Sequence, residues 1–267
     1  MIRFDLHVHT EATAPYMQGD SNLLPYHEHG AAHQLNFMGI SDHVHYFWQR
    51  TRYFRAQREH LDTHEYSSPK LYLGAEQTIL SRQGRIGLRE SGRNVLDYII
   101  LAIHWMPVGG RLGKDMIDRV LLSEGKTRKL ITIAMDFYRN AMVNPKLAMI
   151  PKIIGHPFNF IAFEQGQRTL VLDAIDALCK HCADHHVAFE INSDSIPRDL
   201  SSIDAPHDDY WMQLVASLNA YNVMVTLGSD AHRLENIGNI DQIISCIERY
   251  RLKMSLLVDE SFFETEK

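Results

Sequence analysis

The sequence predicts an α/β fold in which seven short parallel strands alternate with helices in a TIM-like (β/α) barrel. Seven apolar runs rich in Ile, Val, Leu and Phe are separated by segments with helical periodicity, and such runs are typical of buried parallel strands. Most runs end at a polar cluster that contains His, Asp or Glu. Because a barrel gathers the carboxyl ends of its strands in one mouth, this recurrence indicates one site built from many strands.

The seven runs define the expected strands, and the segments between them define the expected helices. The strands are expected at Ile2–Val8, Asn36–Ser41, Lys70–Ala75, Tyr98–Ile103, Met149–Ile154, Val187–Ile191 and Val223–Leu227. The helices are expected at Leu23–Leu35, Arg50–His64, Lys114–Val143, Arg168–His185, Asp208–Tyr221 and Ile237–Tyr250. The stretch Gln77–Leu96 is interpreted as irregular or hairpin-like. Two roles are open for Leu252–Val258, a further strand or a lid.

Composition favours one domain over residues 1–267, in a cytoplasmic protein. The apolar share of 45% is normal for a full core, and no linker or repeat is present. Three Cys fit a reducing compartment, while no apolar run is long enough for a membrane span or a signal peptide. The net charge of −6 argues against nucleic acid as a partner. The oligomeric state cannot be inferred from the sequence.

Two pairs of polar residues lie at the ends of the first and last runs. His7 and His9 close the first run, and Asp230 and His232 follow the last one. Residues i and i+2 of a strand share a face, so each pair can direct both side chains toward one ion. Alone, an H-x-H pair is more often chance than a ligand pair, and a D-x-H after Gly-Ser is typical of a turn. The first and last strands of a closed barrel are neighbours, which favours a shared site.

Three further candidates end buried runs: Glu76, His104 and His156. A buried Glu needs a cation or hydrogen bonds, because an unpaired buried carboxylate is costly. A salt bridge with an Arg is the simpler alternative for Glu76, and each His is equally compatible with a satisfied core residue. As a mixture of imidazoles and carboxylates, the set suits zinc, manganese or iron.

Taken together, these stretches resemble the polymerase and histidinol phosphatase (PHP) superfamily of metallophosphoesterases. The matching stretches, in the order of the family, are Asp5–Thr10, Gly39–His43, Gly74–Glu76, Ala102–Trp105, Gly155–Pro157, Glu190–Ser193 and Gly228–His232. They cover nearly the whole chain. The resemblance implies a distorted seven-stranded (β/α)7 TIM-like barrel, which agrees with the count of apolar runs.

The resemblance also implies two or three divalent metal ions. The ligands implied for the first ion are His7, His9, Glu76 and Asp230, and those for the second are His104 and His156, with Glu76 as the bridge. For a third ion, the matching ligands are His43 and His232.

Members with the third ion usually add a His or Asp in the loop after the first strand, where this sequence has Ala14 or Pro15. A dinuclear centre is therefore expected unless Glu11, Asp20 or His27 replaces that ligand.

Such a centre would activate a water molecule, and the resulting hydroxide would attack phosphorus in line. The catalytic residues expected are Asp230, as a metal ligand, and His43 and His232, either of which would protonate the leaving oxygen if no third ion binds. Arg198 resembles the arginine that histidinol phosphatases of this family place on the substrate phosphate. A solvated loop Arg is its equally weighted alternative.

Three carboxylates are expected near the metals without binding them, in the usual supporting role of hydrogen bonding to ligand His residues. They are Glu190, Asp42 and Asp5.

The expected function is hydrolysis of a small phosphorylated substrate, as in the histidinol phosphatases of histidine biosynthesis. Two alternatives stay open. One is a phosphodiesterase or nucleotidase that acts on cyclic phosphates or nucleotides, although a nuclease should show a basic groove. The other is a non-catalytic metal-binding module, for which eroded ligands would be the signature.

Overall fold

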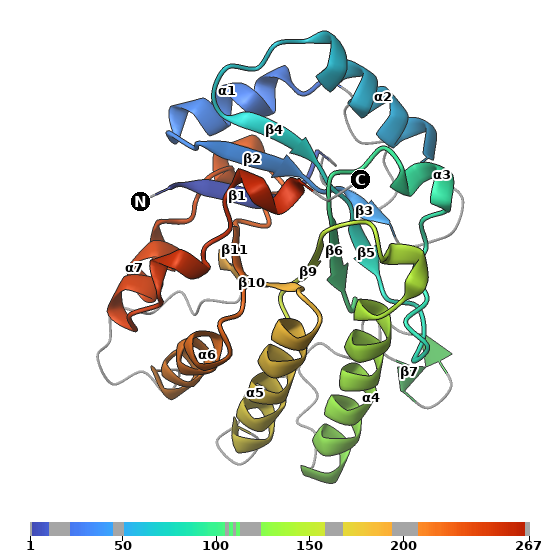
Figure 1. The fold of residues 1–267 in the computed structure, drawn as a ribbon, viewed down its shortest axis with the longest axis vertical. Coiled ribbons are helices and arrows are strands. Elements are labelled where there is room, and N and C mark those ends of the chain that lie inside the picture. Colours follow the sequence, from blue (N-terminus) through green and yellow to red (C-terminus); the bar gives the residue numbers. More distant parts are fainter. Residues whose placement is uncertain are drawn as a thin grey trace.

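The chain folds as an α/β structure, with parallel strands in the centre and helices around them (Figure 1). The computed structural model describes residues 2–10, 22–44, 51–104, 107–108, 111–112, 124–157, 168–193 and 208–264. The strands are β1 (Phe4–Val8), β2 (Phe37–Ile40), β3 (His43–Val44), β4 (Lys70–Leu73), β5 (Glu76–Thr78), β6 (Ile99–Ala102), β7 (Pro107–Val108), β8 (Arg111–Leu112), β9 (Lys152–Ile154), β10 (Ala188–Asn192) and β11 (Val225–Gly228). The helices are α1 (Leu24–Ala32), α2 (Thr51–Thr63), α3 (Glu90–Arg93), α4 (Glu124–Met142), α5 (Arg168–Asp184), α6 (Asp208–Tyr221) and α7 (Asp241–Arg249). The α/β fold predicted from the alternating pattern is confirmed.

The parallel strands form two sheets instead of one continuous ladder. One sheet has the order β1-β2-β4 and the other the order β11-β10-β9-β6-β5-β3, while β7 and β8 pair as a separate antiparallel hairpin. The first and last strands meet through a parallel bridge between Val8 and Ala231. The backbone N–H of His9 donates to the carbonyl of Ala231 at 2.9 Å. The expected proximity of these two strands is therefore present, through a bridge after β11.

Two of the expected strands, Asn36–Ser41 and Lys70–Ala75, end slightly earlier than predicted, and each is followed by a short strand that was not predicted. The chain leaves β2 at Ile40 and re-enters the other sheet as β3, and it passes in the same way from β4 to β5. Hydrogen bonds continue through the break, because Gly74 N donates to Ile40 O at 2.6 Å and Glu76 N donates to Ser41 O at 3.1 Å. The wholly buried ring of Tyr98 fills the space beside the breaks, and a Cβ on Gly39 or Gly74 would lie 2.0 or 2.3 Å from its atoms. Only glycine leaves room for this ring.

Several helix boundaries also differ from the prediction. The last helix begins at Asp241 instead of Ile237, because Gly238 adopts a φ of 73° that a helix does not allow. Residues 114–123 of the expected helix Lys114–Val143 lie outside the described residues. The stretch Gln77–Leu96 combines the end of β5, an antiparallel bridge between Ile79 and Ile86, and the short α3.

The C-terminal segment packs at the amino-terminal ends of the strands. Val258 N donates to Val225 O at 3.0 Å, where β11 begins. Farther along, Phe263 stacks on Tyr72 of β4 with ring centroids 3.6 Å apart, and Glu260 accepts from the Tyr72 hydroxyl at 2.9 Å. The tail therefore covers the base of the strands and is not a lid over their carboxyl ends. None of the described helices combines the length and apolar character that a membrane crossing requires.

Candidate metal centre

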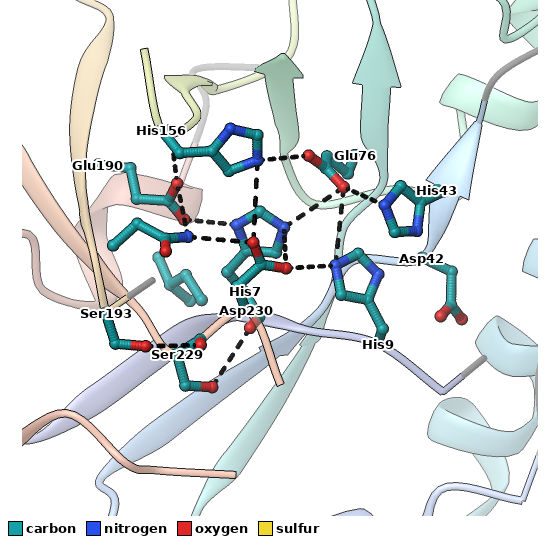
Figure 2. A network of polar contacts seen from close by, with 12 residues as sticks. His7, His9, Asp42, His43, Glu76, His156, Glu190, Ser193, Ser229 and Asp230 are labelled. Atoms are coloured by element: carbon teal, nitrogen blue, oxygen red, sulfur yellow. Dashed lines mark hydrogen bonds and ion pairs between the residues drawn. The ribbon is translucent and has the colours of Figure 1, made fainter. Parts of the chain in front are cut away.

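Imidazoles and carboxylates from both sheets meet at the carboxyl ends of the strands (Figure 2). They come from β1 (His7) and the residue after it (His9), β3 (His43), β5 (Glu76), the residues after β6 and β9 (His104, His156), β10 (Glu190) and the residues after β11 (Asp230, His232). Polar residues end these strands because their apolar parts are buried in the core, whereas the strand ends face the rim.

Glu76 lies at the centre of this group and is only 1% exposed. Its Oε1 lies 2.9 Å from His104 Nε2 and 2.8 Å from His156 Nε2. Its Oε2 lies 2.9 Å from His43 Nε2 and 3.5 Å from His7 Nε2. Burial alone would raise the pKa of Glu76, but the surrounding imidazoles, His104 first among them, hold it well below the ordinary value. Glu76 is thus an anionic acceptor that imidazoles from several strands share.

Asp230 provides the second carboxylate on the same side of the group. Its Oδ1 lies 3.1 Å from His9 Nε2 and 3.5 Å from His7 Nε2. Burial opposes its ionisation, but the charge of His7 and the contact with His9 keep its pKa well below the ordinary value. The residue has a φ of 55°, which few non-glycine residues adopt. The turn after β11 therefore holds Asp230 in an uncommon conformation that directs its carboxylate to the imidazoles of His7 and His9.

The imidazole of His7 in β1 and that of His9, directly after β1, differ in their surroundings. His7 Nδ1 lies 2.6 Å from Glu190 Oε1, and its Nε2 faces Glu76 and Asp230 at 3.5 Å each. Burial would lower the pKa of His7, but these three carboxylates raise it well above the ordinary value. The pKa of His9 is lowered well below its ordinary value, by burial and by other imidazoles. The pKa values of these two imidazoles, which are only two residues apart, are therefore shifted in opposite directions.

The residues present fit a transition-metal ion. His7 Nε2 is buried without a hydrogen-bond partner, which is costly for a buried polar atom, and it faces Glu76 Oε2 at 3.5 Å. With His9, these two residues form a group whose candidate ligand atoms lie within 4.8 Å of one another. His43, Glu76 and His104 form a second such group. Nitrogen and oxygen donors in this mixture suit zinc, manganese or iron.

A third group consists of imidazoles alone. His9, His43 and His232 bring ligand atoms within 4.8 Å of one another, and His232 is exposed at the rim. The predicted substitutes Glu11 and Asp20 lie outside the described residues, as do Ala14 and Pro15. His27, the other predicted substitute, lies on α1 with its ring 4.7 Å from that of Tyr66. Within the described residues, His9 thus completes the group of three imidazoles with His43 and His232.

Glu190 connects three neighbouring strands from behind the group. Besides its contact with His7, its Oε2 accepts from the backbone N–H of His156 at 2.9 Å and from Asn192 Nδ2 at 3.3 Å. A Cβ on Gly228 would lie 2.3 Å from Glu190 Oε1. The glycine before Ser229 is therefore needed to let this carboxylate reach His7.

Asp5 and Asp42 accept hydrogen bonds from donors other than the ligand imidazoles. Asp5 accepts from three backbone N–H groups, those of His7 (3.2 Å), Ser229 (2.9 Å) and Gly238 (3.0 Å). Burial raises the pKa of Asp5 and of Asp42, and their hydrogen bonds oppose the shift. Both residues fix the backbone beside ligands, where the sequence alone suggested contacts with the imidazoles themselves.

Sequence reasoning missed two polar residues that contact the group. Thr78 Oγ1 lies 2.8 Å from His104 Nδ1, and Asn192 Nδ2 reaches Asp230 Oδ2 at 3.5 Å as well as Glu190. Each stands two residues after a candidate, Thr78 after Glu76 and Asn192 after Glu190. The two-residue period of a strand was therefore the signal that could have found both.

The arginine predicted to bind phosphate, Arg198, lies outside the described residues. Two arginines of the described residues pair with carboxylates instead. Arg82 is 3.8 Å from Asp136 of α4, and Arg233 is 3.9 Å from Glu235, with the side chains half exposed or more.

The PHP domain model matches residues 5–194 of the chain. A probable phosphatase of Caldicellulosiruptor saccharolyticus is 26% identical over 193 residues, which are 72% of this chain and 65% of the relative. The chain thus matches slightly less than two thirds of that relative's length. A probable phosphatase of Vibrio campbellii is 21% identical over 262 residues, 97% of this chain and 89% of the relative.

The structure is similar to the crystal structure of a histidinol phosphate phosphatase from Lactococcus lactis, in complex with zinc, L-histidinol and phosphate. The TM-score is 0.66 at 15% identity, and the match covers 100% of this chain and 99% of the other. At that identity the likeness establishes the fold, and the family follows from the match of the domain model over most of the chain. The chain belongs to the PHP domain family.

Proposed function

We propose that the chain is a metal-dependent phosphoesterase that hydrolyses a small phosphate monoester. The observation that carries the proposal is the buried Glu76 carboxylate, which imidazoles of several strands approach to within 2.9 Å. Beside it, His7 Nε2 is buried with no hydrogen-bond partner. The relatives named probable phosphatases support the same activity.

In this proposal each described residue has a defined task. One ion would be held by His7, His9, Glu76 and Asp230, and a second by His104, His156 and Glu76. When bound, such ions lower the pKa of a coordinated water and offset the charge that builds on the phosphoryl oxygens. Glu190 would orient His7 through Nδ1, so that Nε2 faces the ion. Thr78 would orient His104 in the same way.

His43 and His232 would hold the proton that the leaving oxygen needs. His43 is 15% exposed and His232 is exposed, so both lie where an ester could reach them from the rim. His43→Ala should then lower turnover without lowering the number of bound metal ions. Loss of one full equivalent of metal in that variant would show instead that His43 is a ligand.

L-histidinol phosphate is the first substrate to test, because the similar protein of known structure was solved with L-histidinol and phosphate. The purified protein is loaded with zinc, manganese or iron, its metal content is measured, and phosphate release is followed from histidinol phosphate, nucleoside monophosphates and an aryl phosphate. We expect release from at least one monoester. Glu76→Gln should abolish it, whereas Glu248→Gln on the exposed face of α7 should not. A fully metallated protein that releases phosphate from none of these esters would contradict the proposal.

A further inference from the structure

A second polar cluster lies behind the metal centre, around the buried carboxylate of Asp42. Its Oδ1 accepts from the backbone N–H of Thr10 at 2.6 Å, and its Oδ2 accepts from Thr10 Oγ1 at 2.6 Å and from Gln57 Nε2 at 3.0 Å. The hydroxyl of Tyr53 also donates to Oδ2. Figure 2 shows this carboxylate turned away from Glu76, so the cluster is separate from the proposed ligands.

The cluster connects the two backbone segments that carry neighbouring imidazoles. Asp42 directly precedes His43, and Thr10 directly follows His9. The rings of His9 and His43 are stacked with their centroids 4.2 Å apart. Because Asp42 holds both the backbone and the side chain of Thr10, it sets the separation of the segments on which these rings stand.

Helix α2 supplies the other donors of the cluster. Tyr53 and Gln57 are four residues apart in α2 and therefore point to the same side of the helix. Gln57 is fully buried, and its Nε2 also lies 2.5 Å from the Tyr53 hydroxyl. A buried carboxylate is stable in one place only when donors compensate the loss of water. The two side chains therefore fix Asp42 relative to a helix outside the sheets.

We propose that Tyr53 and Gln57 are positioning residues, which act through Asp42 to set the spacing of the His9 and His43 segments and thereby the affinity of the centre for the ion that His9 would hold. The proposal rests on the metal centre of the proposed function, and it does not depend on which ester is hydrolysed. Outer partners of ligand residues typically change metal affinity by about 10–100-fold when they are removed. An effect of this size is expected because Asp42 is the shared hydrogen-bond acceptor of both side chains.

The test compares two conservative substitutions that each remove one phenol hydroxyl. Tyr53→Phe removes a donor to Asp42, and the control Tyr66→Phe removes a hydroxyl that lies 2.6 Å from His60 Nε2, outside the centre. Both tyrosines are half-buried. Metal affinity is measured by competition with a chelator, with zinc and with manganese. The imidazole resonances of the metal-free proteins are recorded by NMR, and thermal unfolding reports on the fold.

We expect Tyr53→Phe to weaken metal binding by about 10-fold or more and to shift the imidazole resonances of His9 and His43. Tyr66→Phe should change the affinity by no more than about twofold. Gln57→Met, which keeps most of the volume and removes the donor, should reproduce the effect of Tyr53→Phe. The proposal is overturned if Tyr53→Phe and Gln57→Met only lower the melting temperature, while the folded protein keeps its metal affinity and imidazole resonances. Because none of these measurements uses an ester, a failed phosphatase assay would not produce this result.

Discussion

Replacing Glu190 with Gln removes one negative charge behind the metal centre and leaves the size of the side chain almost unchanged. The carboxylate has two short contacts, with His7 Nδ1 at 2.6 Å and with the backbone N–H of His156 at 2.9 Å. The Gln amide has only one oxygen, so its NH₂ group must face one of these two donors. The substitution therefore leaves one buried donor unsatisfied.

The cost follows from these contacts. An unsatisfied buried donor costs about 1–3 kcal/mol, and a hydrogen bond to a charged group contributes about 1.5–3 kcal/mol. The two effects overlap because they concern the same atoms, so we expect a loss of about 3 kcal/mol in the free energy of unfolding. In proteins of roughly 150–250 residues, 1 kcal/mol changes the melting temperature by about 2–4 °C. For this slightly longer chain we therefore expect a fall of roughly 6–12 °C in the melting temperature. Metal affinity should fall by about 10–100-fold, because His7 loses the group that orients it.

Thermal unfolding of the metal-free protein and chelator competition measure the two effects separately. The matched control is Glu248→Gln, which removes the same charge from an exposed position on α7. The reasoning is refuted if Glu190→Gln matches this control in both melting temperature and metal affinity.

Three other measurements test the fold and the centre. Gly228→Ala places a Cβ 2.3 Å from Glu190 Oε1, so overpacking should destabilise the fold by about 1–3 kcal/mol in urea unfolding, whereas Gly125→Ala, where the new Cβ meets nothing within 4 Å, should not destabilise it. The hydrogen bond with Lys70 lowers the pKa of Glu260 below its ordinary 4.5, so this contact stabilises the fold above that pH and is lost as the pH falls through the lower folded value. Glu260→Gln should therefore cost less than about 1 kcal/mol at pH 7, because the pair is exposed, and nothing once the carboxyl of the unmodified protein is protonated. Zinc at about 100 times its dissociation constant should stabilise the protein by about 2.7 kcal/mol in thermal unfolding, and a chelator should reverse this gain.

Each of these outcomes has a clear opposite. If Gly228→Ala and Gly125→Ala had equal free energies of unfolding, the Glu190 carboxylate would be able to move away from the new Cβ without loss of stability. A difference between the Glu260 variant and the unmodified protein that grows toward low pH would reverse the sign expected for a lowered carboxyl pKa. A melting temperature that does not respond to zinc would exclude a folded-state site for that ion.

The sequence was sufficient to predict the fold class and the approximate positions of most strands, because the longer parallel strands lie in apolar runs that end at polar residues. The short strands β3 and β5 consist mostly of polar residues and were not predicted. The sequence was not sufficient to place the interruptions after Ile40 and Leu73. The local sequence there looks like an ordinary strand end, and the space beside each break is filled by Tyr98, whose position depends on the tertiary fold.

For the candidate site, the sequence could name residue types but not their contacts. Nothing in the strand ends indicates that one oxygen of Glu76 would face His104 and His156 while the other faces His43. Tyr53 and Gln57 were missed for a different reason. They belong to a helix, and only the packing of that helix against the rim brings them to Asp42.

The central place of Glu76 has a consequence for divergence among relatives of this chain. Since one carboxylate meets imidazoles from separate strands, the loss of any member leaves the others with uncompensated charge or an empty coordination position. Single substitutions among these residues are then disfavoured during evolution. We expect descendants either to retain all the imidazoles and carboxylates around Glu76 or to lose them together, with apolar side chains in their place at the carboxyl ends of the strands.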